Sequence, residues 1–160
     1  MNSSEASAGT TIAGSGLVLF AYDGSDLAEL AIDEAGRQLP RGRDALVLCV
    51  WQPADVGFVP AGELRLNAAQ ASEVKKAAEE TAAHGAKLAE KAGFRARSMA
   101  AESAPTWRGI AKVADERDVD LIVLGSHGRH GFAGRVFGSV AAAVAEHCRQ
   151  SVLIVHRRPD

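Results

Sequence analysis

The chain carries one glycine-rich pattern whose spacing suits phosphate binding, Gly-x2-Gly-x9-Gly-Ser at Gly125, Gly128, Gly138 and Ser139. The first glycine ends a short apolar run, residues 121–124, which is typical of a buried strand. The last two positions open an alanine-rich stretch that predicts a helix. Glycines let backbone N–H groups approach an anion closely, and a helix N-terminus adds partial positive charge. A strand, a glycine loop and a helix start in this order therefore predict an anion site.

The same positions also have a purely structural interpretation. A tight connection between a strand and a helix often needs glycine at positive φ without any ligand, and Ser139 suits the N-cap of the following helix. Two further glycines in the loop, Gly131 and Gly134, favour backbone access or mobility over a single turn. The Ser139 hydroxyl would equally donate to a phosphate oxygen, so both of its roles stay open.

Charged and polar residues near the loop give the predicted site its character. Asp23 follows an apolar run, where its simplest role is to cap the next helix or to form an Asp-Gly turn. Arg129 and Arg135 make the glycine loop basic and would screen a triphosphate. His130 is expected to be a solvated loop residue, whereas His127 lies inside the glycine turn, where its ring would border a ligand.

Other chemistries lack the residues that they need. The sequence has no Gly-x4-Gly-Lys-[Ser/Thr] motif, and Gly14-Ser15-Gly16 precedes the first predicted strand instead of following it. It has no Gly-x-Ser-x-Gly elbow, and its histidines lack a paired-ligand spacing for zinc. We therefore assign no catalytic residue and no metal-binding side chains from the sequence.

Apolar runs alternate with stretches of helical periodicity along the chain, and the predicted strands lie at 17–21, 45–51, 94–100, 121–124 and 152–155. The run at 94–100 is the weakest, and its alternating arginines are typical of an edge strand. Such alternation predicts an α/β fold with a parallel sheet and helices on both faces. In these sheets ligands bind at the carboxyl ends of the strands, where the strand order reverses.

From Leu17 to about His156 the chain resembles the universal stress protein family, in its ATP-binding branch. The glycine spacing carries this resemblance, together with the segments 18–25, 119–125 and 151–156. The family implies a single Rossmann-like domain, here 17–160, with a five-stranded parallel sheet of order 3-2-1-4-5. In that order the loops that carry Asp23 and Gly125 would meet.

The resemblance also implies a ligand, ATP, with or without Mg or Mn. The glycines and Ser139 would hold the phosphates, Asp23 would lie near the ribose or a bound metal, and the backbone of Val50 would pair with the adenine edge. The full set of implied nucleotide-binding residues is Ala21, Tyr22, Asp23, Val50, Leu124, Gly125, His127, Gly128, Arg129, Gly138, Ser139 and Val140.

The expected function is a nucleotide-responsive regulator in stress adaptation. An alternative is a slow ATPase or phosphotransferase, but no dedicated general base is identifiable. A second alternative keeps the pocket and changes the ligand to AMP or cyclic AMP. A third is a nucleotide-free interaction module, which the intact glycines disfavour.

Composition and the chain ends set the remaining expectations. Residues 1–16 read as a flexible tail without the features of a signal peptide, and no apolar run approaches the ~20 residues that cross a bilayer. The net charge of −2 does not suit nucleic-acid binding. Two distant cysteines favour a reducing compartment, so a cytoplasmic protein is expected. The apolar strand 152–155 at the sheet edge predicts a homodimer, which the resemblance also implies.

Overall fold

The computed structural model describes residues 16–52, 68–128 and 137–157. The predicted tail, apart from Gly16, lies outside these ranges, as does most of the segment that joins the second strand to the next helix.

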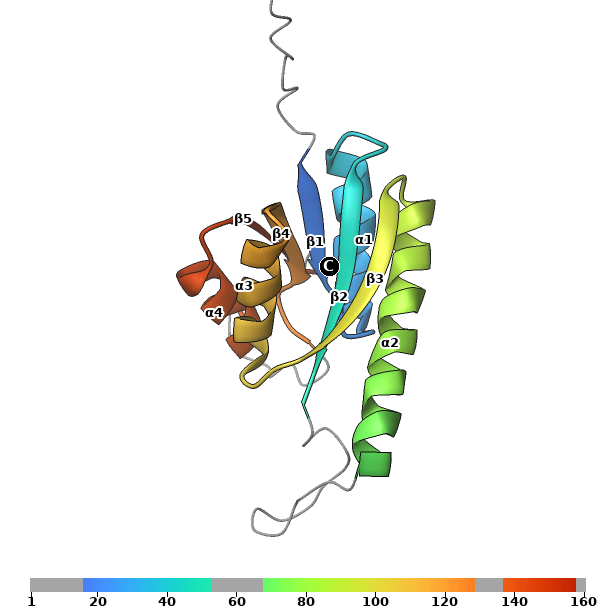
Figure 1. The fold of residues 1–160 in the computed structure, drawn as a ribbon. Helices are drawn as coiled ribbons and strands as arrows, with labels where there is room; N and C mark the ends of the chain where they lie inside the picture. Colours follow the sequence, from blue (N-terminus) through green and yellow to red (C-terminus); the bar gives the residue numbers. More distant parts are fainter. Residues whose placement is uncertain (1–15, 53–67, 129–136, 158–160) are drawn as a thin grey trace, which may run out of the picture.

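The described elements follow the predicted alternation (Figure 1). They are β1 (Leu17–Ala21), α1 (Asp26–Gln38), β2 (Asp44–Trp51), α2 (Ala68–Lys91), β3 (Arg95–Glu102), α3 (Thr106–Glu116), β4 (Val119–Gly125), α4 (Ser139–His147) and β5 (Ser151–Val155). All neighbouring strands pair in parallel, in the order β3-β2-β1-β4-β5. The predicted fold and strand order are therefore confirmed.

The two larger apolar cores lie on opposite faces of the sheet. One contains the buried sides of α1 and α2, and the other those of α3 and α4; Figure 1 shows the two pairs of helices on opposite sides of the strands. The central strand β1 serves both, because Val18 and Phe20 face the first core and Leu19 faces the second. A strand buried on both faces reads as a continuous apolar run, as it does here.

Helix α1 begins where a side chain caps it. The Ser25 hydroxyl oxygen accepts the backbone N–H of Ala28 at 3.3 Å, which satisfies one of the donors that a helix start leaves open. Ala28, Ile32 and Ala35 then bury one face of the helix against the sheet. The cap fixes the direction in which the chain leaves β1, and so the position of the residues between them.

Helix α2 packs unusually close to the sheet at Gly85. A Cβ at this position would lie 2.6 Å from Cδ1 of Tyr22 and 2.8 Å from Cγ1 of Val47. Real Cβ atoms do not come so near to other atoms, so this contact requires glycine at position 85.

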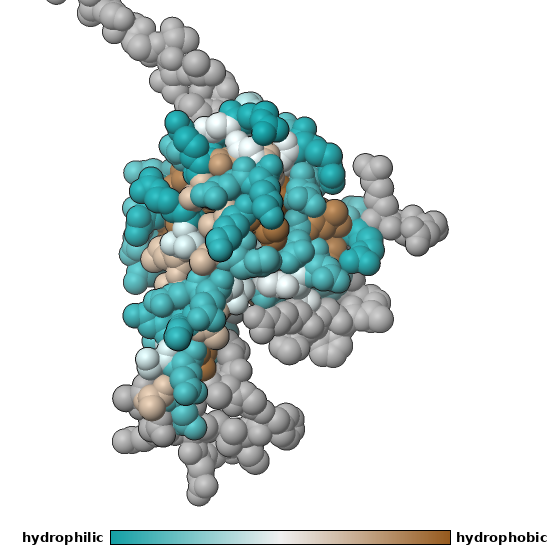
Figure 2. Space-filling view, turned by 90° about the vertical axis from the view of Figure 1, so that its right-hand side faces the viewer, coloured by the Kyte–Doolittle hydropathy of each residue, from teal (hydrophilic) through white to brown (hydrophobic). Residues whose placement is uncertain are grey.

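The outer surface on the α2 side is mostly hydrophilic, with smaller hydrophobic areas between the polar side chains (Figure 2).

The two edges of the sheet differ in charge. β3 carries exposed Arg95 and Arg97, and Arg95 bonds Asp44 of β2 at 2.9 Å. β5 forms the other edge, and its Val152, Leu153 and Ile154 are half-buried and uncharged. Charge protects a strand edge from pairing with another chain, so β5 is the edge suited to pairing.

Candidate functional site

The loops that follow β1 and β4 meet at the carboxyl end of the sheet. Ala21 and Leu124 are register partners at the ends of these two strands, and from there the chain turns toward opposite faces, into α1 and α4. A Cβ on Gly128 would lie 2.5 Å from Oδ2 of Asp23. The structure thus brings together Asp23 and the glycine loop, as the topology predicts.

Asp23 has two oxygens with different surroundings. Its Oδ1 accepts the backbone N–H of Ser25 at 3.0 Å, across a turn in which Gly24 has a φ of 79°. This is the turn-forming role expected for Asp before glycine. Its Oδ2 faces Gly128. One oxygen therefore shapes the turn while the other presents negative charge to the loop after β4.

The motif glycines are needed for close approach and not for an unusual φ. Gly125, Gly128 and Gly138 all lie outside the left-handed region, and the described glycines with positive φ are Gly24, Gly42 and Gly93. None of these three motif glycines therefore needs a positive φ, and Gly131 and Gly134 lie outside the described residues. A Cβ on Gly125 would lie 2.9 Å from the Leu27 Cβ, and one on Gly138 would lie 3.1 Å from the Ser126 carbonyl oxygen. A side chain at Gly125 would force its neighbour to move, and one at Gly138 would make a contact tighter than side chains normally make.

Helix α4 begins at Ser139, as the sequence predicts, so the N-cap is the residue before Ser139. Its N-cap is Gly138, whose carbonyl oxygen accepts the N–H of Ala142 at 3.0 Å, and Ser139 is the first helical residue. The predicted N-cap role of Ser139 is therefore wrong. Gly138 has no side chain to cap this helix, and no described side chain does so; the first-turn N–H groups and the exposed Ser139 hydroxyl are therefore suited to an anion.

Ser126 ties the glycine loop to the rest of the sheet. Its N–H donates to the Val155 carbonyl at 2.7 Å and its carbonyl accepts the Gly138 N–H at 2.6 Å. Its side chain is 2 % exposed and lies 3.1 Å from Nδ1 of His127, Oγ to nitrogen. Sequence reasoning missed this residue, because a serine between two motif glycines reads as loop. Its contacts hold the two halves of the motif together and fix the His127 ring.

Val50 presents its backbone at the same end of the sheet. The Trp51 carbonyl accepts the N–H of Ser103, on the β3 side. Because backbone groups alternate along a strand, those of Val50 face the β1 side. The β1–β2 pairing ends before that point, at the bond from the Tyr22 N–H to the Leu48 carbonyl. Val50 therefore offers a donor and an acceptor beyond the end of β1.

The remaining residues predicted to bind the nucleotide differ in which of their groups lie at the loop. The Tyr22 side chain is buried in the α1–α2 core and its hydroxyl donates to Oε1 of Glu29 at 3.3 Å, so only its backbone lies at the loop. Burial, followed by the charge of Glu29, raises the pKa of Tyr22 to about 12. Ala21, Leu124 and Val140 pack into the opposite core. Arg129 lies outside the described residues.

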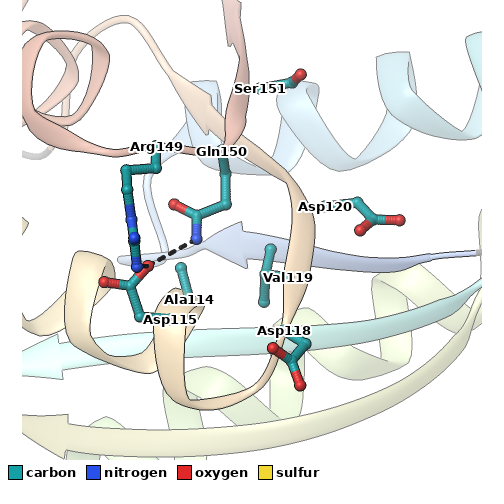
Figure 3. Close-up of a pocket in the computed structure, with 8 residues that line it drawn as sticks. All are labelled: Ala114, Asp115, Asp118, Val119, Asp120, Arg149, Gln150 and Ser151. Atoms are coloured by element: carbon teal, nitrogen blue, oxygen red, sulfur yellow. Dashed lines mark hydrogen bonds and ion pairs between the residues drawn. The ribbon is translucent and has the colours of Figure 1, made fainter.

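Two hollows lie at opposite ends of the sheet. One, of about 430 Å³, adjoins the glycine loop and is lined by Leu27, Ser126, His127, Phe137, His156 and Arg157. The other, of about 520 Å³, lies at the amino ends of β4 and β5 (Figure 3). Size alone therefore does not mark the candidate site. In the described part of the chain, no three His, Cys, Asp or Glu residues are grouped to hold a metal ion, and no helix could span a bilayer.

Comparisons with known proteins agree with this architecture. The family model of the universal stress protein family matches residues 16–156. A universal stress protein of Mycolicibacterium smegmatis is 34% identical over 153 residues, which cover 88% of this chain and 46% of the relative. One of Mycobacterium tuberculosis is 32% identical over 146 residues, covering 86% of this chain and 44% of the relative. The chain thus spans about half the length of these relatives.

Solved structures share the fold. The protein MJ0577 superposes with a TM-score of 0.72 at 22% identity, covering 92% of this chain and 99% of that one. A universal stress protein in complex with cAMP has a TM-score of 0.56 at 26% identity, covering 89% of this chain and 98% of that one.

Proposed function

The chain belongs to the universal stress protein family, and we propose that it binds an adenine nucleotide at the carboxyl end of β1 and β4. The observation that carries the proposal is the meeting of three features: the Asp23 carboxylate, the close-packed glycine loop and the uncapped start of α4. A helix N-terminus without a capping side chain favours negative charge. The phosphates would lie over Gly128, Gly138 and Ser139.

The base would lie toward β2. The outward N–H and carbonyl of Val50 supply one donor and one acceptor from a single residue. Such a pair complements the edge of an adenine. Since these are backbone groups, any residue type except proline, which lacks the N–H, would serve at this position. The apolar side chains of Ala21 and Leu124 would lie beneath the nucleotide, where they pack into the α3–α4 core.

Among adenine nucleotides we propose ATP, with or without Mg or Mn. The glycine spacing supports a polyphosphate, and Asp23 Oδ2 stands where a metal could join carboxylate and phosphate. The described residues fit a cation only in part, because Asp23 is a single carboxylate and a magnesium ion would draw its other ligands from phosphate and water. Cyclic AMP is the second candidate, favoured by the relative solved in complex with it.

The proposed role is regulation in stress adaptation and not turnover. At the loop, the described groups able to act as a base are Asp23 and His127, and both are held by neighbours: Asp23 by Ser25 and His127 by Ser126. Ordinary turnover needs a positioned base and charge stabilisation at the transferred phosphoryl group. We also propose that the protein acts in the cytoplasm, because neither Cys49 nor Cys148 forms a disulfide and unpaired cysteines are typical of a reducing compartment.

We further propose a homodimer through β5. The Val155 carbonyl accepts the Ser126 N–H on the β4 side, so by alternation the backbone groups of Val152 and Ile154 face away from β4. An uncharged edge with outward donors and acceptors favours pairing with a second copy.

Mass spectrometry of the gently denatured, purified protein tests the ligand. Co-purified ATP supports the first candidate, and cyclic AMP supports the second. Absence of any nucleotide, followed by no binding of added ATP, ADP, AMP or cyclic AMP with or without magnesium, would overturn the proposal.

A further inference from the structure

Ser126 has a side chain that its structural role in the loop does not explain. It is 2 % exposed, and it is the one serine or threonine that is buried in the part of the chain that the structure describes. Its two backbone bonds, to Val155 and to Gly138, need no hydroxyl. A buried hydroxyl is costly unless its proton has an acceptor, so the partner of this hydroxyl is informative.

That partner is the ring of the next residue. Among the described residues, the hydrogen-bonding neighbour of Ser126 Oγ is Nδ1 of His127, at 3.1 Å. A hydroxyl carries one proton, and with this single neighbour its proton points at Nδ1, which accepts it through a lone pair. A neutral imidazole has one N–H and one acceptor nitrogen. Since Nδ1 is the acceptor, the ring proton lies on Nε2.

The other side of the His127 ring lies at the start of α4. Its Cδ2, the carbon bonded to Nε2, is 3.7 Å from the position that a Cβ of Gly138 would take. Gly138 is the N-cap of α4, so the ring stands beside the first turn, where the phosphates are proposed to lie. His127 is half-buried and borders the hollow next to the glycine loop, so a ligand can reach the ring.

We propose that Ser126 is a positioning residue for the nucleotide site. Its hydroxyl holds His127 in the tautomer whose Nε2 carries the proton, and so presents an N–H donor to a phosphate oxygen at the start of α4. The other tautomer would turn a lone pair toward the phosphate, which would repel it. This inference rests on the proposed nucleotide site and adds a residue that acts on the ligand through another.

The same proton position limits what His127 can do chemically. Its Nε2 cannot take a proton from an attacking water or hydroxyl group while it already carries one, and the Nδ1 lone pair is engaged by Ser126. A general base needs a free lone pair within reach of the proton that it removes. In this tautomer the ring binds phosphate without activating a nucleophile.

Nitrogen NMR of the histidine rings tests the position of the proton. The full chain is isotope-labelled and measured at about pH 8, where ordinary imidazoles are mostly neutral. Of the five histidines, His127 gives the signals that vanish in His127→Gln. We expect a protonated Nε2 and an unprotonated Nδ1. A wild-type ring that carries its proton on Nδ1 overturns the inference without any need for a serine variant.

Calorimetric titration with ATP tests the effect on binding. Ser126→Ala removes the hydroxyl but leaves the backbone bonds of this residue, and the ATP dissociation constant should rise about fivefold, as for a lost hydrogen bond. In a His127→Gln background the same serine change should alter the constant by less than about twofold, because the hydroxyl acts through the ring. Ser98→Ala, at an exposed serine of β3, is the matched control and should leave the constant unaltered.

The outcomes separate this inference from the nucleotide site itself. Circular dichroism shows whether each variant is folded; should Ser126→Ala not fold, Ser126→Cys offers only a weak S–H donor and should show the same loss of affinity. A wild-type chain that binds no adenine nucleotide overturns the proposed function and the phosphate contact with it. A chain that binds ATP equally well without the hydroxyl, or that loses the same affinity with and without the His127 ring, overturns the positioning role and leaves the nucleotide site standing.

Discussion

Asp23 and Gly128 are in contact across the switch point of the sheet: a Cβ on Gly128 would lie 2.5 Å from Oδ2 of Asp23. The two residues are more than a hundred positions apart and come from the loops after two different strands, β1 and β4. Their contact is possible because residue 128 has no side chain. The carboxylate therefore stands directly against the loop proposed to hold phosphates.

Asp23→Asn should separate the two roles of this carboxylate. The amide oxygen still accepts the Ser25 N–H, so the free energy of unfolding should change by less than about 0.5 kcal/mol. The oxygen facing Gly128 loses its charge, and ATP affinity in magnesium should fall about tenfold, equal to roughly 1.4 kcal/mol. Calorimetric titration with and without magnesium measures this. An affinity equal to wild type in both conditions would leave Asp23 a turn residue only.

Two serines at helix starts provide a matched pair. Ser25→Ala removes the cap of α1 and should lower the free energy of unfolding by ~1 kcal/mol with little effect on nucleotide binding. Ser139→Ala removes no cap, because Gly138 occupies that position, and should leave stability within about 0.5 kcal/mol of wild type. It should weaken nucleotide binding by the ~1 kcal/mol of a lost hydrogen bond. Equal destabilisation by both variants would contradict the assignment of Gly138 as the N-cap.

The buried Tyr22 gives the protein a stability loss in strong alkali. Its pKa of about 12 in the folded state exceeds the ordinary value of 10.0, so between these values the unfolded chain has lost a proton that the folded chain retains. Stability should therefore fall as pH rises from about 10 to 12, by at most ~1.4 kcal/mol per pH unit.

Tyr22 is the sole tyrosine among the 160 residues, so phenolate absorbance near 295 nm reports on it alone. We expect a midpoint near 12 for the folded protein and near 10 in denaturant. Tyr22→Phe should remove the phenolate signal and flatten the alkaline loss of stability. A folded-state midpoint near 10 would contradict the buried Tyr22–Glu29 pair.

Proline at two neighbouring positions of β5 tests the dimer edge. Ile154→Pro removes an N–H that faces away from β4, a position where an edge strand tolerates proline. The chain should stay folded by circular dichroism and become monomeric in sedimentation. Leu153→Pro removes an N–H on the β4 side and should unfold or strongly destabilise the subunit. A folded dimer with Ile154→Pro would show that β5 is not the interface.

Much of this fold was predictable because the strands and the helices differ in the spacing of their buried apolar residues. β1 and β4 are apolar runs buried on both faces, and the helices between them carry one buried stripe. The periodicity of apolar residues does not predict the strand order, which here came from the family resemblance. The meeting of Asp23 with the glycine loop followed from that order.

The details of the site were harder to predict from the sequence, because they depend on contacts between individual atoms. Residue preferences favour serine over glycine as an N-cap, so Ser139 was assigned a role that the Gly138 backbone performs. Positive φ was the structural alternative for the motif glycines, whereas Gly125 and Gly138 lie at ordinary φ and close against Leu27 and Ser126. Ser126 has no sequence signal, since its importance lies in backbone bonds to Val155 and Gly138.

The most direct test of the nucleotide site compares thermal unfolding of wild type and Gly128→Val with and without ATP. A valine there must displace the Asp23 carboxylate, a flexible group that can turn away, and would fill the space where the backbone approaches a phosphate. At about 100 times the dissociation constant, ATP should stabilise wild type by ~2.7 kcal/mol, seen as a clear rise in melting temperature. Gly128→Val should unfold cooperatively and show no rise. An equal rise in both proteins, or no rise in wild type with any adenine nucleotide, would contradict a phosphate site at this loop.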